Sequence, residues 1–356
     1  MHQVKFNNKV KPFKNLLDQR IKEFFISQEL NERGNWKLYS KTIILFTVLL
    51  GSLATVLFVL PNSWWAVAVF MLMGLTMASI GFNVMHDAAH GSYSKNVKLN
   101  NFIAFLGGDA MGGGTFFWKI KHNIIHHTYT NVEGIDDDIA KYPMYRFSPH
   151  QKRLWFHKFQ HIYGIPAYML ISLNWLLTDD VITLFKKKIN TTPIRNIATK
   201  EIVLMFAGKI LNVLLFLVLP LLLMQWQIAL VGFLCLHACM GLSLAIVFQL
   251  AHVVEHTEFP LADVETNVID NEWAKHQVET TANFAMRNKV ISWYVGGLNY
   301  QVEHHLYPRI SHIHYPKISK IVKDTCEEMG VRYTAFPTMF QAFGSHVRLL
   351  KQLGAA

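Results

Sequence analysis

Two pairs of long apolar stretches constrain the fold of this 356-residue chain most strongly. The first pair covers about residues 42–60 and 64–84, and the second about residues 201–219 and 226–254. Each stretch approaches the roughly 20 apolar residues that a helix needs to cross about 30 Å of hydrocarbon. Short turns at Pro61 and Pro220 separate the members of each pair. The sequence therefore predicts an all-α integral membrane protein with four transmembrane helices in two hairpins.

The distribution of charged residues predicts how these helices are oriented. Only 16% of the residues are charged, against about 25% in soluble proteins. Apart from Lys209, every Lys and Arg lies outside the stretches and outside the turns at 61–63 and 220–225. Positive residues gather on the cytoplasmic side of membrane proteins. We therefore expect both termini and residues 85–200 on the cytoplasmic side, and the net charge of +10 then needs no nucleic-acid partner.

Eight histidines form four clusters next to the apolar stretches, and all four clusters fall on the predicted cytoplasmic side. They are His86 and His90, then His122, His126 and His127, then His252, and finally His304 and His305. Ionisable side chains close to lipid are costly, and they usually mark a functional site. Their convergence at one membrane face predicts a polynuclear metal site, held by a cytoplasmic helical cap.

The spacing within the clusters suits two metal ions. His86 and His90 are four residues apart and share one face of a helix. His126 and His127 are adjacent, so on a helix they point about 100° apart, and residues 304–305 make the same fork. Two ions, each served by one member of each fork, follow from this pattern. Imidazole suits zinc, copper, iron or nickel, so the spacing alone leaves the metal open.

Polar side chains near the clusters are candidates to orient the ligating imidazoles, because residues around a metal site commonly do so. We predict this role for Asp87, Gln249 and Glu303, and Asp136 is a further candidate. The sequence leaves open whether His256, one turn after His252, extends the cluster.

Two further segments, residues 100–118 and 163–184, are moderately apolar but too interrupted to predict clean membrane spans. The first contains five glycines between Gly107 and Gly114, and the second is followed by three lysines at 186–188. We interpret both as interfacial or re-entrant segments.

Four motifs resemble those of the membrane-bound fatty acid desaturases. They are His86-Asp-Ala-Ala-His90, the run from Trp118 to His127, Thr130-Asn131 with Asp136 to Ile139, and Gln301-Val-Glu-His304-His305-Leu-Tyr-Pro308. The similarity covers about residues 82–318. It is closer still to the front-end branch, which inserts a double bond between an existing one and the carboxyl end. Gln301, where other branches have histidine, is typical of that branch.

The resemblance implies a non-haem di-iron centre that uses O2 as co-substrate to introduce a cis double bond into a long acyl chain. The implied ligands, carried over by position, are His86, His90, His122, His126, His127, His252, His304 and His305, with Gln301 binding directly or through water. The substrate is expected to be an acyl-CoA or an acyl-lipid. The fused-cytochrome motif His-Pro-Gly-Gly is absent from the sequence, so electrons are expected from a separate ferredoxin or cytochrome b5 type of donor.

These expectations divide the chain into three parts. They are a cytoplasmic segment, residues 1–41, a desaturase membrane and catalytic domain, residues 42–318, and a cytoplasmic tail, residues 319–356. Two alternatives stay open at this point. One is a related di-iron lipid hydroxylase or sphingolipid desaturase or hydroxylase, and the more remote one is a non-enzymatic membrane metal-binding protein. The position of the new double bond and the oligomeric state are also open.

Overall fold

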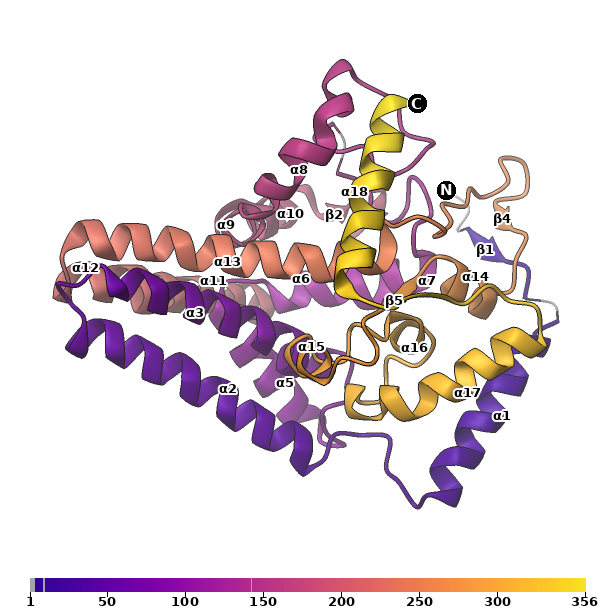
Figure 1. Ribbon diagram of the computed structural model, residues 1–356, viewed down its shortest axis with the longest axis horizontal. Coiled ribbons are helices and arrows are strands. Elements are labelled where there is room, and N and C mark those ends of the chain that lie inside the picture. The colour runs from indigo at the N-terminus through magenta and orange to yellow at the C-terminus, as the bar shows by residue number, and fades with distance from the viewer. Residues whose placement is uncertain (1–3, 9, 142) are drawn as a thin grey trace.

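Most of the chain is helical in the computed structural model, which describes residues 4–356 apart from residues 9 and 142. Among the described residues, four helices are long and apolar enough to cross a membrane: Trp36–Val59, Trp65–Ala89, Thr199–Leu223 and Trp226–His252. In Figure 1 these spans extend to the left, and the shorter helices gather on the right. The prediction of a mostly helical chain with four candidate membrane spans is confirmed.

The spans are built from α2 (Trp36–Ala54), α3 (Trp65–Ile80), α11 (Thr199–Val213), α12 (Leu219–Leu223) and α13 (Trp226–His252). Short π-helical turns extend α2 to Val59, join α3 to α4 (His86–Ala89), and join α11 to α12. Spans two and four therefore reach the first and third histidine clusters without interruption.

Both hairpins turn at the same end of the molecule. The backbone N–H of Gln225 donates a hydrogen bond to the carbonyl of Pro61, with an N···O distance of 3.1 Å, which ties the two turns together. Trp64, Trp65 and Trp226 are 60–77% exposed beside these turns. Exposed tryptophans commonly anchor a helix at the membrane interface, so this end is where we expect one surface of the bilayer.

The remaining elements form a cap at the opposite end of the spans. Between the hairpins lie α5 (Val97–Gly107), α6 (Thr115–Lys119), α7 (His127–Tyr129), α8 (Gln160–Tyr168), α9 (Ile171–Asn174) and α10 (Asp180–Lys186). After the second hairpin come α14 (Trp273–Glu279), α15 (Lys289–Tyr294), α16 (Gln301–Leu306), α17 (Tyr315–Glu328) and α18 (Met339–Ala355).

Three short strand pairs join segments of the cap. Strand β1 (Lys5–Phe6) pairs in parallel with β4 (Val268–Ile269), β2 (Lys188–Ile189) pairs antiparallel with β3 (Thr192–Pro193), and β5 (Ala282–Phe284) pairs in parallel with β6 (Thr334–Phe336). The first pair holds the start of the described chain against the loop that follows span four.

The N-terminal helix α1 (Pro12–Ser27) covers the outer side of the cap. Phe13 and Leu17 of this helix are fully buried in a cluster that includes Val302 of α16 and Val322 of α17. Burying a large apolar side chain contributes about 1.5–3 kcal/mol. Helix α1 therefore helps to fix α16, the helix that carries the last two clustered histidines.

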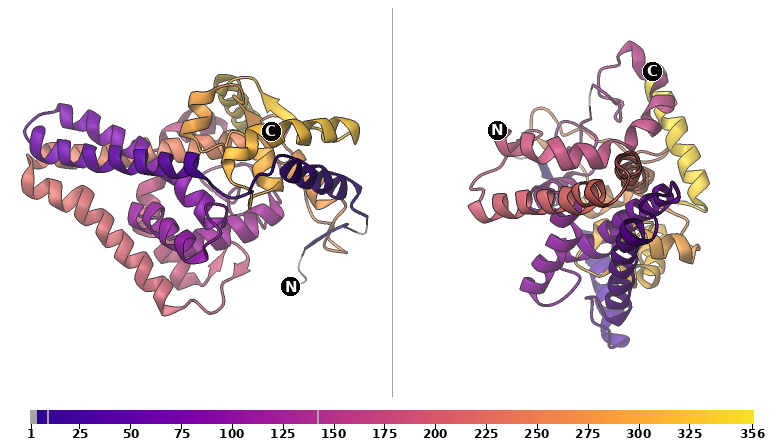
Figure 2. Two further views of the ribbon diagram at one scale, coloured as in Figure 1. Left: turned by 90° about the horizontal axis from the view of Figure 1, so that it is seen from below. Right: turned by 90° about the vertical axis from the view of Figure 1, so that its left-hand side faces the viewer.

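Span three stands apart from the other spans. In the left view of Figure 2 it diverges from them, and only 28% of its apolar window is buried, against 61% for span two. Its contact with the cap is close at Gly208, where an added Cβ would lie 2.4 Å from the carbonyl oxygen of Asp109. Lipid is expected to cover most of its remaining surface.

A bent helix pair crosses span four and closes the side of the cap. The helices Trp155–Tyr168 and Ile171–Lys186 meet at an angle of 67°. The Nζ atom of Lys209, on span three, lies 2.8 Å from a carboxylate oxygen of Asp180 and donates to the carbonyl of Trp175 at 2.7 Å. The ion pair is buried, so it fixes the bent pair against span three. This is the interrupted segment for which the sequence predicts an interfacial or re-entrant position.

Candidate metal centre

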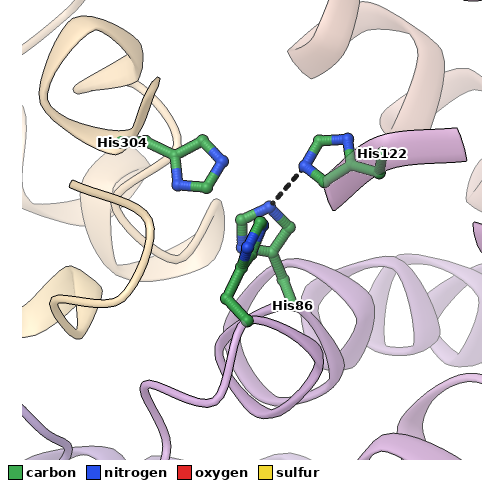
Figure 3. Close-up of side chains that lie close together, drawn as sticks. His86, His122 and His304 are labelled. Carbon is green, nitrogen blue, oxygen red and sulfur yellow. Dashed lines mark hydrogen bonds between the residues drawn. The ribbon is translucent and has the colours of Figure 1, made fainter. Parts of the chain in front are cut away.

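The eight clustered histidines meet inside the cap, although four separate segments supply them. His86 and His90 lie at the end of span two, and His252 is the last residue of span four. The second cluster comes from a π-helical turn, Ile120–His126, and from α7, and residues 304–305 lie on α16. The structure thus brings together all eight histidines that the sequence indicates as ligands. Figure 3 shows how close three of the rings lie.

The imidazole nitrogens form overlapping groups in which all ligand atoms lie within 4.8 Å of one another. The groups are His86 with His90, His122 and His304, then His126 with His252 and His305, then His127 with His304 and His305, and finally His122 with His126 and Asp138. His304 belongs to the first group and His305 to the second. The third group, which contains both of them with His127, connects the first two. Two neighbouring ion positions fit this arrangement.

The distances between nitrogens are compatible with metal coordination as well as with hydrogen bonds between the rings. The Nε2 atom of His122 lies 3.2 Å from Nε2 of His86 and 3.2 Å from Nε2 of His127. Two nitrogens that each lie about 2 Å from one ion are about 3 Å apart. Such spacing is what a shared ion requires.

Buried nitrogens without a hydrogen-bond partner support the same interpretation. Among the described residues, the Nε2 atoms of His90, His126, His304 and His305 are buried and have no partner. A buried polar atom left unsatisfied costs free energy, and coordination of an ion removes that cost. These residues therefore fit a bound metal.

Partners on the far side of three of the rings hold these imidazoles in their orientation. The Nδ1–H groups of His126 and His305 donate to Asp136 (2.9 Å) and to the side-chain oxygen of Gln277 (2.8 Å). The hydroxyl of Tyr315 lies 3.1 Å from Nδ1 of His304. With Nδ1 engaged, Nε2 is left to face the shared space. Asp136 was a candidate from the sequence, whereas Gln277 and Tyr315 were missed because they lie in no recognisable pattern.

Of the three other side chains predicted to orient ligands, Asp87 and Glu303 bond to residues outside the cluster. Asp87 accepts hydrogen bonds from Ser311 Oγ (2.6 Å) and from the backbone N–H of His312. Glu303 accepts from Asn283 (2.8 Å) and Tyr333 (2.7 Å). These carboxylates fix the chain around the histidines, whereas the oxygen of Gln249 has no partner among the described residues.

Gln301 lies at the edge of the second group. Its side chain is buried, and its Nε2 atom lies 3.1 Å from Nε2 of His252. A half-turn of the amide would place its oxygen, which can act as a ligand, in the same position. His256 is exposed, with a φ of 76°, and it belongs to none of the groups.

The protonation of the cluster also suits a metal. Burial lowers the pKa of His90, His304 and His305 well below the usual value, and neighbouring imidazoles lower it further. Burial also lowers the pKa of His126, but the Asp136 carboxylate raises it, and the net direction is upward. Neutral imidazole is the form that coordinates metal ions, so most of the cluster is in that form at neutral pH.

A cavity of about 930 Å³ lies beside the histidines. His86, His122, Gln249 and Gln301 are among its lining residues. Its apolar wall includes Phe82, Met85, Met111, Met240, Leu244 and Leu298. Cavities of this size and character bind small, mostly apolar molecules. A metal cluster that opens onto such a cavity suits chemistry on an apolar chain.

Comparisons with known proteins agree with this geometry. Residues 62–337 match the family model described as fatty acid desaturase. The chain is 36% identical over 342 residues to the sn-1 linoleoyl-lipid 6-desaturase of Arthrospira platensis, covering 96% of this chain and 92% of the relative. It is 37% identical over 354 residues to the protein of the same name from a Synechocystis species, covering 99% and 98%.

A more distant relative carries a different name. The chain is 32% identical over 348 residues to the acyl-lipid (8-3)-desaturase of Physcomitrium patens, covering 95% of this chain and 71% of the relative. The similarity to proteins of this kind extends over both hairpins and the cap.

Proposed function

The chain belongs to the fatty acid desaturase family, and we propose that it desaturates acyl chains of membrane lipids at two iron ions held by the clustered histidines. The family confirms the predicted activity, that of an oxidoreductase that introduces double bonds into fatty acyl groups, and it implies the use of iron. The non-enzymatic alternative is thereby set aside. The observation that carries the two-iron proposal is the set of partnerless Nε2 atoms, which point into two adjacent groups.

The proposed ligands share burial and a nitrogen or amide directed into the common space. They are His86, His90, His122, His126, His127, His252, His304 and His305, with Gln301 as a ligand or a holder of bound water. Iron with O2 supplies the oxidant needed to remove hydrogen from unactivated methylene groups, which no side chain can do. Asp136, Gln277 and Tyr315 hold the rings, and the cavity orients the chain and excludes water.

The names of the relatives support a substrate and a position for the new bond. Two of them are called linoleoyl-lipid 6-desaturases, and Gln301 is shared with the front-end branch that the sequence resembles. We therefore propose a linoleoyl-type acyl-lipid as the substrate, with the cis double bond placed between the existing bonds and the carboxyl end. A separate ferredoxin or cytochrome b5 type of protein would supply electrons.

The proposed location puts the cap and both termini on the cytoplasmic side of the membrane. The two turns without Lys or Arg lie together at one end of the spans, and positive residues favour the cytoplasm. The proposed membrane and catalytic domain covers residues 42–318, with residues 1–41 and 319–356 as cytoplasmic segments.

Expression in a host that lacks polyunsaturated lipids tests this proposal. With linoleate added to the medium, we expect a fatty acid with a third double bond on the carboxyl side of the first two. Gas chromatography with mass spectrometry of derivatives that reveal bond positions provides the measurement. Cells with an empty vector are the control. Hydroxylated acids without new double bonds would favour the hydroxylase alternative and contradict the proposal.

A further inference from the structure

The cavity beside the histidines is also lined by charged side chains that the desaturation chemistry does not use. Among its charged lining residues are Asp137, Lys141, Asp179, Lys186 and Lys188. We call these five residues the charged rim. An apolar acyl chain has no use for such groups, so they call for a polar portion of the substrate.

The charged rim connects directly to the candidate metal centre. Lys141 pairs with Asp137 at 3.0 Å, and Lys121 pairs with Asp137 at 3.1 Å and with Asp138 at 2.8 Å. Asp138 in turn lies 3.6 Å from Nδ1 of His126. A polar group bound at the rim would therefore lie a short distance along the chain from the reacting carbons. Front-end desaturation demands this, because the new bond forms close to the carboxyl end.

Two lysines of the rim are available for a ligand. Lys186 and Lys188 are exposed, and neither has an ion pair among the residues that the structure describes. They stand at the end of α10 and in β2, where the bent helix pair leaves the spans. Lysines at the level of lipid head groups attract their polar and anionic parts.

The cavity also opens toward an apolar surface. Leu170, Ile171 and Ile182 of the bent pair line the cavity and are 58%, 37% and 47% exposed, respectively. We call these three residues the lateral opening. Leu177 and Phe185 beside them are 62% and 81% exposed. A large exposed apolar surface indicates contact with a partner or with lipid, and in a protein with four spans the lipid is the bilayer itself.

We propose that an intact glycerolipid enters through the lateral opening and that Lys186 and Lys188 bind its ester and head group. This inference rests on the proposed function and adds the binding site for the polar end of the substrate. The acyl chain then runs past the histidines into the apolar wall while the glycerol part stays at the membrane surface. A soluble acyl-CoA has no need of an opening bordered by exposed leucine and isoleucine.

The first test compares two variants of the full-length protein in membranes that supply the electron donor. Lys186→Gln with Lys188→Gln removes the two rim lysines that have no ion pair among the described residues. Lys187→Gln removes a neighbouring exposed lysine that does not line the cavity. We expect the double variant to raise the apparent KM for linoleoyl phospholipid in mixed micelles by about 10- to 25-fold, since each lysine near a lipid surface contributes roughly fivefold. The kcat and the KM of Lys187→Gln should stay at wild-type values.

The second test blocks the lateral opening. Ile182→Trp adds bulk at the opening, and Leu177→Trp adds the same bulk on the exposed surface away from the cavity. We expect Ile182→Trp to lower the amount of glycerolipid that co-purifies with the protein, counted by native mass spectrometry, while Leu177→Trp retains it. The count does not depend on activity, and circular dichroism and iron content check that both variants are folded and loaded.

A comparison of substrates distinguishes a failure of this inference from a failure of the proposed function. Linoleoyl phospholipid, linoleoyl glycolipid and linoleoyl-CoA are offered to the wild-type protein, and we expect at least one lipid to react more efficiently than the CoA ester. Preference for the CoA ester, or unchanged KM and lipid retention in both test variants, would overturn the inference but leave desaturation intact. If the wild-type protein desaturates none of the three, the proposed function itself fails.

Discussion

Replacement of His126 by alanine is expected to abolish desaturation while the protein still folds and inserts into the membrane. Its Nε2 atom is buried without a partner, and its Nδ1–H is held by Asp136. Loss of a residue that only orients a ligand typically lowers metal affinity or activity by about 10- to 100-fold, so loss of a ligand should cost more. The fatty acid profile of fed cells and the iron content of the purified protein provide the measurements.

His150→Ala is the matched control for this variant. His150 is exposed and belongs to none of the groups that could hold a metal, and its Nε2 atom lies 2.8 Å from the carbonyl oxygen of Phe259. We expect normal activity and iron content from it. Substantial residual desaturation by His126→Ala, at a normal level of protein in the membrane, would contradict the assignment of this histidine as a ligand.

The second large effect is expected from Asp136→Asn, which removes a charge and keeps the shape of the side chain. Asp136 is fully buried, accepts the His126 Nδ1–H at 2.9 Å, and also accepts the backbone N–H of Asn131 at 2.9 Å. Without the carboxylate, His126 is a weaker base and its ring is less firmly oriented. We expect iron affinity or activity to fall by about 10- to 100-fold.

Iron titration of the metal-free protein measures the effect of Asp136→Asn on iron affinity. Activity at saturating iron then measures its effect on catalysis. Asp324→Asn, on the exposed side of α17, is the control and should behave as wild type. Wild-type iron retention together with wild-type activity in Asp136→Asn would show that the carboxylate does not support the cluster.

The sequence predicted those parts of the fold that depend on apolar length and on charge. The four spans follow from hydropathy because a backbone in lipid must satisfy its hydrogen bonds internally, and a long apolar helix does so within one segment. The gathering of the eight histidines was also predictable, because charge placed every cluster at one end of the hairpins. His252 could be recognised in this way although it stands alone in the sequence.

The local geometry of the site was less predictable, because it depends on contacts between distant segments. Gln277 meets His305 only because α14 packs beside α16, and no spacing in the sequence encodes that contact. The π-helical turn before His127 brings the Nε2 atoms of His122 and His127 to 3.2 Å, whereas α-helical spacing would favour His122 with His126. Asp87 was a reasonable candidate by position, but Ser311 and His312 occupy its carboxylate.

The wall of the cavity was also only partly predictable from the sequence. The segment 163–184 was recognised as too interrupted for a clean span, and the structure gives it a 67° bend. The sequence did not predict that this segment lines the cavity. That role depends on the ion pair between Lys209 and Asp180 and on the close crossing of the segment over span four at Gly241. Both contacts join helices that lie far apart along the chain.

The iron content of purified, active, full-length protein tests the central claim most directly. Inductively coupled plasma mass spectrometry, normalised by amino-acid analysis, gives the number of metal ions per chain. The two adjacent groups around His304 and His305 predict two irons per active chain, with a loss of iron in both His126→Ala and His304→Ala. A fully active chain that holds one iron, or that holds zinc in place of iron, would contradict the account.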